Sequence, residues 1–178
     1  MPKKIVITGG PSSGKTTLIH FFQEQGFQCI HEISRSITIE AQKEGIDQLF
    51  LTDPLLFSQK LLDGRLKQFN DAEHLEKTVL FYDRGLPDVT AYMDFTESNY
   101  PDSFFETCNN NRYDMVFLLP PWKDIYEQDN ERYESFEEAE IIYQFLLKSY
   151  QKYGYQVIEV PTGSLEYRMQ FILNYLTE

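Results

Sequence analysis

The segment GGPSSGKTT, at positions 9–17, combines small residues with a lysine in a spacing that points to chemistry. Gly9 is followed by four further residues and then by Gly14, Lys15 and Thr16, which is the Walker A pattern. In such a loop the backbone N–H groups surround phosphates, the lysine reaches the β- and γ-phosphates, and the threonine hydroxyl binds Mg²⁺. The segment therefore predicts a site for ATP or GTP, formed by Gly9, Gly10, Pro11, Ser12, Ser13, Gly14, Lys15, Thr16 and Thr17.

A carboxylate and an arginine accompany the second apolar segment of the chain. Glu32 lies at or just past the end of this segment, and Arg35 follows three residues later. A carboxylate beside the γ-phosphate could accept a proton from an acceptor hydroxyl, and Arg35 could bind a phosphate or hold Glu32. The alternative is structural, with Glu32 capping the next helix and Arg35 solvated. Both interpretations stay open.

The sequence DRGLPD, at positions 83–88, follows a third apolar segment. An apolar run that ends in aspartate is like a Walker B strand, which predicts that Asp83 lies near Mg²⁺, directly or through water. Arg84 is costly to bury without an anion, so we expect it to contact a phosphate or the acceptor. The alternative is a turn with an Asp–Arg surface pair. Asp88 is a weaker candidate for the acceptor site, because it could simply lie in the first turn of the next helix.

A long polar connection follows the fourth apolar segment. Residues 124–140 contain eight carboxylates and one basic residue, Arg132. Long connections of this kind are often lids, so we predict a lid at about residues 121–135 in which Arg132 neutralises charge on the transferred phosphoryl group. The alternative is a solvated acidic face with Arg132 in a pair one helical turn apart. The segment PTGS, at positions 161–164, is expected either to pack against an adenine ring or only to cap the last helix.

These residues need elements that bring them together. Short apolar segments predict five strands, at residues 3–8, 28–33, 78–82, 115–119 and 156–160. Helical spacing predicts helices at residues 14–25, 34–43, 54–70, 136–153 and 164–176. The helix at 54–70 would carry an apolar stripe of Leu55, Leu56, Leu61, Leu62 and Leu66. Strands alternating with helices indicate an α/β protein, whose parallel sheet is covered on both faces and binds ligands at its carboxyl edge.

Composition excludes several classes of partner. The 178 residues carry a net charge of −12, whereas nucleic acids and anionic membranes need a basic surface. No segment approaches the roughly 18 apolar residues of a membrane span, and the apolar run near the N-terminus is too short for a signal peptide. Cys29 and Cys108 fit no metal or redox spacing. We expect one cytoplasmic domain over residues 1–178, with no nucleic-acid or membrane partner; the oligomeric state stays open.

Taken together, these segments resemble the NadR-type P-loop ATPase and kinase family, which has a ribosylnicotinamide-kinase-like AAA domain. The resemblance runs nearly end to end and rests on Glu32 with Arg35 and on the segments GGPSSGKTTL, FYDRGLPD, FLLPPW, QDNERYES and PTGS. It implies a P-loop NTPase fold like that of nucleoside and nucleoside-monophosphate kinases, with strand order 2-3-1-4-5, a mobile lid and Mg-ATP. It also implies that Glu32 or Asp83 is the carboxylate near the acceptor and that Arg132 is a lid arginine. Pro11 stands where the ribosylnicotinamide kinases are expected to have a glutamate.

The leading hypothesis is a small-molecule kinase that transfers the γ-phosphoryl group of Mg-ATP to a hydroxyl of a nucleoside-like acceptor. In this hypothesis Glu32 acts on the acceptor side, and Asp83 lies on the metal side together with Thr16. The acceptor would contact Glu32, Arg35, Arg84 and Asp88. The alternative is a nucleotide-switched regulatory ATPase or GTPase-like protein without a small-molecule acceptor, whose acidic lid is a partner surface.

Overall fold

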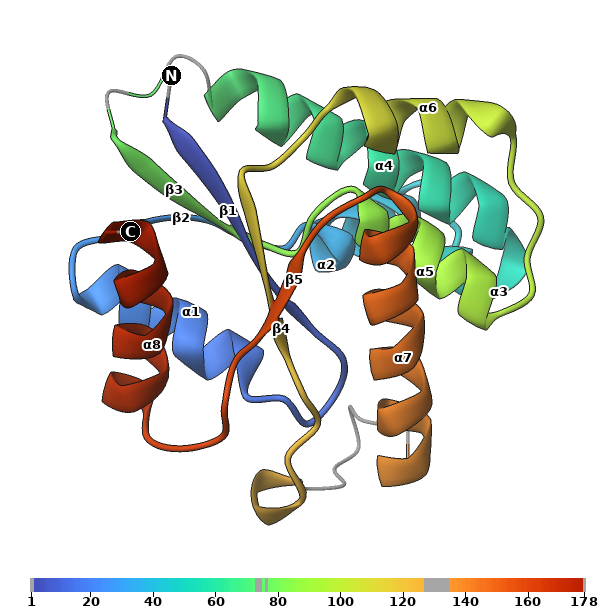
Figure 1. Cartoon of the computed structure of the whole chain (residues 1–178). Helices are drawn as coiled ribbons and strands as arrows, with labels where there is room; N and C mark the ends of the chain where they lie inside the picture. Colours follow the sequence, from blue (N-terminus) through green and yellow to red (C-terminus); the bar gives the residue numbers. More distant parts are fainter. Residues whose placement is uncertain (1, 73–74, 76, 127–134, 178) are drawn as a thin grey trace.

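The computed structural model describes residues 2–72, 75, 77–126 and 135–177. Its centre is a parallel sheet of five strands in the order β2-β3-β1-β4-β5 (Figure 1). The strands are β1 (Lys3–Gly9), β2 (Gln28–Ile30), β3 (Val79–Asp83), β4 (Met115–Leu119) and β5 (Val157–Glu159). The predicted α/β P-loop NTPase fold and its strand order 2-3-1-4-5 are thus confirmed.

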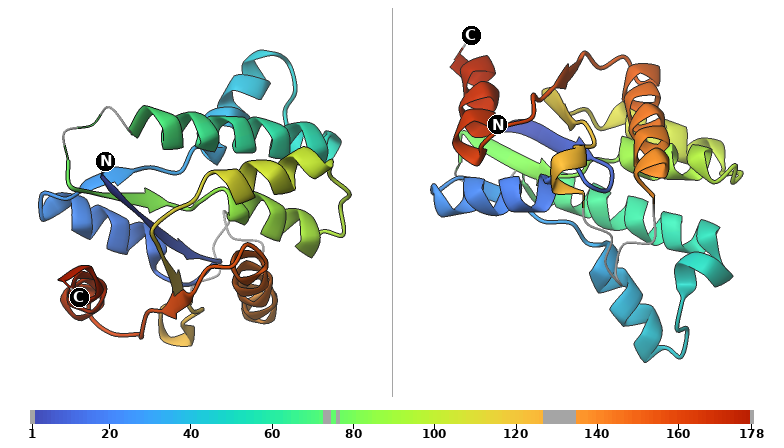
Figure 2. Two further views of the ribbon diagram at one scale, coloured as in Figure 1. Left: turned by 45° about the horizontal axis from the view of Figure 1, so that its top comes forward. Right: turned by 90° about the horizontal axis from the view of Figure 1, so that it is seen from below.

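Helices cover both faces of this sheet (Figures 1 and 2). One face carries α1 (Lys15–Glu24) and α8 (Leu165–Thr177). The other carries α4 (Pro54–Asp71), α5 (Pro87–Phe95), α6 (Asp102–Asn110) and α7 (Phe136–Lys152). The remaining described helices are α2 (Ser34–Lys43), α3 (Leu49–Thr52) and the 3₁₀ turn η2 (Lys123–Ile125).

The alternation of side chains along β1 produces the two layers of core. Ile5 and Ile7 point to one face and pack with α1 and α8, whereas Val6 points to the other face and packs with α4 and α6. All three side chains are fully buried. A strand that is buried on both faces reads as a continuous apolar run, which is why the segment before the glycines was recognisable.

Several predicted boundaries agree with the structure, but β2 ends at Ile30 and not at residue 33, and the apolar stripe predicted for α4 is only partly buried. α2 and β4 have the expected limits, and Ser164 accepts a hydrogen bond from the Tyr167 N–H, as a residue that caps α8 should. The leucine stripe of α4 fails at its start, because Leu55 and Leu56 are exposed. An 18-residue helix is about 27 Å long, whereas the central strands span about 17–23 Å, so the first turn of α4 extends past the core.

In the part of the chain that the structure describes, no helix combines the length and apolarity that a membrane span requires.

Candidate active site

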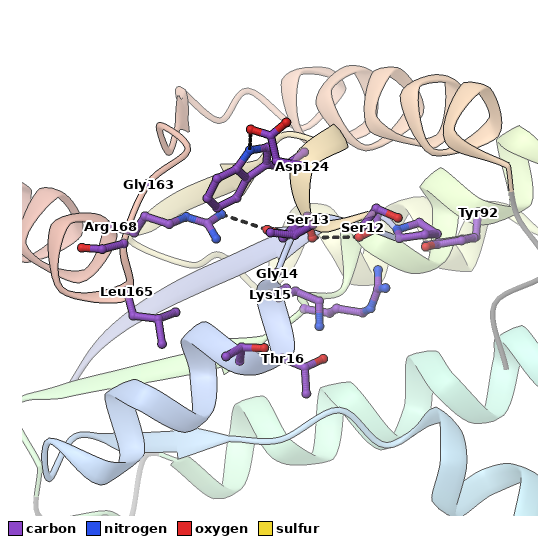
Figure 3. Close-up of a pocket in the computed structure, with 17 residues that line it drawn as sticks. Ser12, Ser13, Gly14, Lys15, Thr16, Tyr92, Asp124, Gly163, Leu165 and Arg168 are labelled. Atoms are coloured by element: carbon purple, nitrogen blue, oxygen red, sulfur yellow. Dashed lines mark hydrogen bonds between the residues drawn. The ribbon is translucent and has the colours of Figure 1, made fainter. Parts of the chain in front are cut away.

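The loop between β1 and α1 lies at the carboxyl edge of the sheet (Figure 3). Ser12 and Gly14 have left-handed backbone conformations, with φ of 60° and 71°, and Gly14 is the N-cap of α1. The Ser13 hydroxyl donates a 2.8 Å hydrogen bond to the carbonyl of Gly10. A Cβ atom at Gly9 would lie 2.8 Å from the Ser13 oxygen, so that position requires glycine. These features curl the loop around the start of α1, where backbone N–H groups favour anions.

A cavity of about 700 Å³ opens over this loop. Residues 10–17 line it, and we call it the phosphate-loop pocket. Gly9 is the last residue of β1 and directly precedes this stretch. Thr16 is exposed at the pocket, which suits a residue that is expected to meet a ligand.

Lys15 and Asp83 form an ion pair beneath the pocket. β1 and β3 are neighbours in the sheet, and their register places Ile7 opposite Asp83, which ends β3. Both side chains are about 8% exposed or less. Burial lowers the pKa of Lys15, and the charge of Arg84 lowers it further, whereas Asp83 acts in the opposite direction. A phosphate that binds Lys15 would therefore compete with Asp83 for the same ammonium group.

Arg84 occupies a left-handed backbone conformation, with φ of 73°, directly after β3. Its N–H donates a 3.1 Å hydrogen bond to the carbonyl of Ile7, which fixes the turn. Its guanidinium is paired on two sides, by Nε with the Glu32 Oε2 atom at 2.8 Å and by Nη1 with the Asp88 Oδ1 atom at 3.1 Å. The expectation that a buried Arg84 needs anions is met here by two carboxylates of the chain itself.

Glu32 caps the next helix, as the structural alternative predicted, and it is also held by two arginines. Its Oε1 atom accepts hydrogen bonds from the N–H groups of Ile33 and Ser34, at 2.9 and 3.0 Å, so it caps the start of α2. Arg65 Nη2 binds both of its carboxylate oxygens, at 3.0 and 2.9 Å. Burial alone would raise the pKa of Glu32, but Arg65 and Arg84 outweigh it and lower the pKa to about 2. Glu32 is thus a carboxylate that stays ionised at neutral pH.

Arg65 was not predicted from the sequence as a site residue. It projects from the buried side of α4, is 5% exposed, and also donates a 3.1 Å hydrogen bond to the carbonyl of Gly85. A signal was present, because position 65 falls one turn after Leu61 and one turn before Phe69, both of which are buried. An arginine on an apolar stripe indicates a buried anion partner.

A second cavity, of about 450 Å³, adjoins the first. Glu32, Arg65, Arg84 and Asp88 supply its charged lining. Most of the remaining wall is aromatic or aliphatic, including Phe50, Phe57, Leu61, Val89, Tyr92, Met93, Phe95 and Ile142. Arg84 and Tyr92 line both cavities, so the second pocket and the phosphate-loop pocket share a wall at these two side chains.

Asp88 is fully buried in the first turn of α5. Its oxygens accept hydrogen bonds from the Thr8 hydroxyl at 2.6 Å, the Tyr150 hydroxyl at 2.5 Å, the Gly85 N–H at 2.9 Å and Arg84 at 3.1 Å. A carboxylate offers about four acceptor positions, so these four donors satisfy it. Asp88 therefore fixes Arg84 and the turn before α5, and offers little to a ligand.

The remaining predictions concern Arg35, the lid and the PTGS turn. Arg35 is exposed on α2, and the ion pairs of Glu32 are made by Arg65 and Arg84 in its place. Arg132 and residues 127–134 of the predicted lid lie outside the described residues. Gly163 and Ser164 of the PTGS turn line the phosphate-loop pocket, as do Trp122 and Arg168, which the sequence reading did not single out.

The residues at the loop fit a Mg²⁺ ion that arrives with a nucleotide. Within the described ranges no group of three or more His, Cys, Asp or Glu side chains gathers as a metal site, so the protein alone offers few ligands. Thr16 presents a hydroxyl to the pocket, and Asp83 has a carboxylate beside Lys15. Mg²⁺ commonly takes one or two protein oxygens and completes its shell with phosphates and water.

Comparison with solved structures shows the same fold in two proteins. Deoxyadenosine kinase from M. mycoides, with products dCMP and a flexible dCDP bound, has a TM-score of 0.70 at 18% identity, over 98% of both chains. NadR in complex with NR has a TM-score of 0.72 at 17% identity, and NadR with NAD and AMP-PNP has 0.69 at 19%. The match covers 98% of this chain but only 50% and 48% of the two NadR chains, so this chain spans about half the length of NadR. At these identities the likeness establishes the fold alone.

Sequence comparisons identify the family of the chain. No curated protein sequence was matched. A family model described as an AAA domain matches residues 4–168, from β1 into α8, and so includes the phosphate loop, Glu32, Asp83 and Arg84. This match and the likeness to NadR confirm the resemblance drawn from the motifs. The chain belongs to the AAA domain family and shares its fold with NadR.

Proposed function

We propose that this protein is a kinase that transfers the γ-phosphoryl group of Mg-ATP to a hydroxyl of a nucleoside-like acceptor. The observation that carries the proposal is the shared wall between the two pockets, where Arg84 and Tyr92 line both. A protein that only binds and hydrolyses ATP needs the phosphate loop, but it does not need a second pocket with a buried carboxylate at the junction. NadR and deoxyadenosine kinase, which have this fold, were solved with nucleotides or with NR.

The lining of the second pocket favours an acceptor that carries no phosphate. Two cations, Arg65 and Arg84, face two carboxylates, Glu32 and Asp88, and all four are held in ion pairs or hydrogen bonds. Among the described residues of this lining, no cation is left over for a second phosphate group. The ionised carboxylate of Glu32 would repel a second phosphate group. The aromatic side chains Phe50, Phe57 and Phe95 suit a flat, uncharged ring.

The chemistry assigned to Glu32 is to orient the acceptor hydroxyl and receive its proton. As the hydroxyl oxygen bonds to the γ-phosphorus, the bond from that phosphorus to the bridging oxygen breaks and ADP leaves. A carboxylate with a pKa of about 2 is a weak base, and its five hydrogen-bond contacts leave little room for a hydroxyl. Arg84 also lines the phosphate-loop pocket, so we propose that the γ-phosphate draws it away from the Oε2 atom of Glu32, which then keeps the hydrogen bond from Arg65 and can accept one from the acceptor hydroxyl.

Lys15 and Asp83 have separate roles in binding the nucleotide, Lys15 toward the phosphates and Asp83 toward Mg²⁺. A triphosphate would take Lys15 from Asp83, and the released Asp83 carboxylate together with the Thr16 hydroxyl would hold Mg²⁺. The ion, when bound, neutralises charge on the β- and γ-phosphates. Positioning and charge stabilisation account for most of the catalysis of phosphoryl transfer, so a weak base at Glu32 is compatible with the reaction.

The rate of ADP release from Mg-ATP tests the proposal. It is measured without an acceptor and with each member of two matched panels of compounds. One panel holds nucleosides and related uncharged ring compounds, and the other holds their 5′-monophosphates. We expect at least one member of the first panel to accelerate ADP release and the corresponding monophosphate to be inactive. ADP release that no compound accelerates would support the nucleotide-switched alternative. Acceleration by monophosphates only would contradict the charge argument.

A further inference from the structure

A buried hydrogen-bond cluster surrounds Asp88, and none of the roles above uses the two hydroxyl groups in it. The Oδ1 atom of Asp88 accepts hydrogen bonds from the Thr8 hydroxyl at 2.6 Å and from Arg84 Nη1 at 3.1 Å. Its Oδ2 atom accepts from the Tyr150 hydroxyl at 2.5 Å and from the Gly85 N–H at 2.9 Å. Asp88, Thr8 and Tyr150 are completely buried, so water is poorly placed to replace a donor that is removed.

The two hydroxyl groups connect Asp88 to distant parts of the chain. Thr8 is in β1 and lies two residues before the phosphate-loop pocket begins its lining. Tyr150 lies on α7, 62 residues after Asp88. The N–H of Arg84 donates to the carbonyl of Ile7, the neighbour of Thr8 in β1. Asp88 and Arg84 are therefore both fixed relative to the strand that leads into the phosphate loop.

Gly85 makes room for the Tyr150 hydroxyl. A Cβ atom at Gly85 would lie 2.6 Å from the Tyr150 hydroxyl oxygen, closer than such contacts allow. The φ of Gly85 is not positive, so the close approach of Tyr150 and not the backbone conformation requires glycine here. Burial and the neighbouring charge of Asp88 raise the pKa of Tyr150, so its hydroxyl stays protonated and donates at neutral pH.

The ion pair between Arg84 and Asp88 gains importance when a nucleotide binds. In the proposed function the γ-phosphate draws Arg84 away from Glu32, and within the described part of the chain Arg84 then keeps Asp88 as its carboxylate partner. A carboxylate that has lost a donor can turn about its Cβ–Cγ bond and move the guanidinium with it. Phosphoryl transfer depends mostly on positioning and charge stabilisation, and a misplacement of about 1 Å can cost about 10²-fold in rate.

We propose that Tyr150 and Thr8 are positioning residues, which act through Asp88 to hold Arg84 where it meets the γ-phosphate. This inference rests on the proposed function and deepens it, because it names two side chains outside the linings of both pockets on which the transfer step depends. A role in stability alone would leave kcat of the folded protein unchanged.

Steady-state kinetics with an acceptor that accelerates ADP release tests this inference, together with calorimetric titration of Mg-ATP. Tyr150→Phe and Thr8→Val keep the shape of the side chain and remove only the hydroxyl group. We expect kcat to fall by about 10–100-fold and the Kd for Mg-ATP to change by less than about threefold, because Lys15 and the loop backbone still hold the phosphates. Equal losses in kcat and in affinity for ATP, or an unchanged kcat, would overturn the inference.

Tyr153→Phe is the matched control. Tyr153 caps the C-terminus of α7, is buried, and donates through its hydroxyl to Thr90 of α5 at 3.2 Å. The variant removes a buried hydroxyl from the same contact between α7 and α5 without touching Asp88, so its kcat should equal that of the wild type. A Tyr153→Phe protein as slow as Tyr150→Phe would show that packing of the two helices is responsible, and would also overturn the inference.

A second measurement needs no acceptor and so separates the inference from the proposed function. The ¹H–¹⁵N NMR signal of the Arg84 Nε–H group, assigned by its loss in Arg84→Lys, reports the surroundings of the guanidinium. We expect this signal to differ from that of the wild type in Tyr150→Phe and in Thr8→Val, but not in Tyr153→Phe, both with and without Mg-AMP-PNP.

Each outcome decides a different point. If no compound accelerates ADP release, the proposed function fails and the Arg84 signal alone decides whether Tyr150 and Thr8 position Arg84. A signal in Tyr150→Phe that coincides with that of the wild type would overturn the inference even if the protein is a kinase. Should Tyr150→Phe not fold, Thr8→Val decides by the same two measurements.

Discussion

Replacing Glu32 by glutamine should destabilise the protein by an amount that depends on pH. The substitution keeps the shape of the side chain and removes the charge that pairs with Arg65 and Arg84. Arg65 is 5% exposed, so the substitution leaves a buried cation without its carboxylate. The variant also loses an acceptor for the N–H groups of Ile33 and Ser34 if the amide turns the wrong way.

The magnitude follows from the pKa of Glu32. A folded-state pKa of about 2, against an ordinary 4.5, corresponds to about 3 kcal/mol of stability at pH 7, since each pKa unit is worth about 1.4 kcal/mol. Because the folded-state pKa is depressed, this stability is present above pH 4.5 and is lost as the pH falls toward 2. At pH 3.5 about 2 kcal/mol should remain. The side chain is 22% exposed, so screening by solvent is limited.

Urea unfolding followed by circular dichroism measures this difference. The gap in unfolding free energy between the wild type and Glu32→Gln should be about 3 kcal/mol at pH 7 and smaller at pH 3.5. Glu40→Gln is the control on α2, the helix that Glu32 caps, because Glu40 is exposed, and it should change stability by no more than about 0.5 kcal/mol. A gap below about 1 kcal/mol at pH 7, or one that widens on acidification, would refute the assigned ion pairs.

Three further predictions concern the nucleotide side. Lys15→Ala should abolish or strongly weaken binding of Mg-ATP with the fold intact, and unchanged affinity in a calorimetric titration would refute the loop assignment. Asp83→Asn should raise the Mg²⁺ concentration needed for half-maximal turnover; a turnover curve that superimposes on that of the wild type would remove Asp83 from the metal side. Arg132→Ala should lower kcat more than it weakens ATP binding, and an equal effect on both would argue against a lid arginine that acts on the transferred group.

The fold could be predicted from the sequence because local signals and burial agree. β1 is apolar because both of its faces are covered, and Gly14 with Lys15 follows at the point where the strand must turn into α1. Glu32, Asp83 and Arg84 were found because polar residues after strands meet at the carboxyl edge of a parallel sheet. Which cation holds Glu32 was not predictable in this way.

The two arginines that were not predicted are far from their partners in the sequence. Arg65 reaches Glu32 from α4, 33 residues away, and Arg168 reaches Ser13 from α8, 155 residues away. Neither arginine belongs to a local motif, so only the packing of α4 and α8 brings them to the site. Arg35 was the nearer candidate in sequence, but the start of α2 turns it toward solvent. Asp88 lies in the first turn of α5, as the alternative for it predicted, but the sequence did not show that packing of α5 against α7 buries it and pairs it with Tyr150.

The most direct test of the central claim follows the γ-phosphoryl group itself. ATP labelled with ³²P at the γ-position is incubated with the protein, Mg²⁺ and a compound that accelerates ADP release, and the products are separated. The two-pocket arrangement predicts that the label appears on the compound in amounts equal to the ADP formed, and that Glu32→Gln reduces this transfer by about 10²–10⁴-fold while ATP affinity is nearly unchanged. Label recovered only as inorganic phosphate would contradict the claim that the second pocket holds a phosphoryl acceptor.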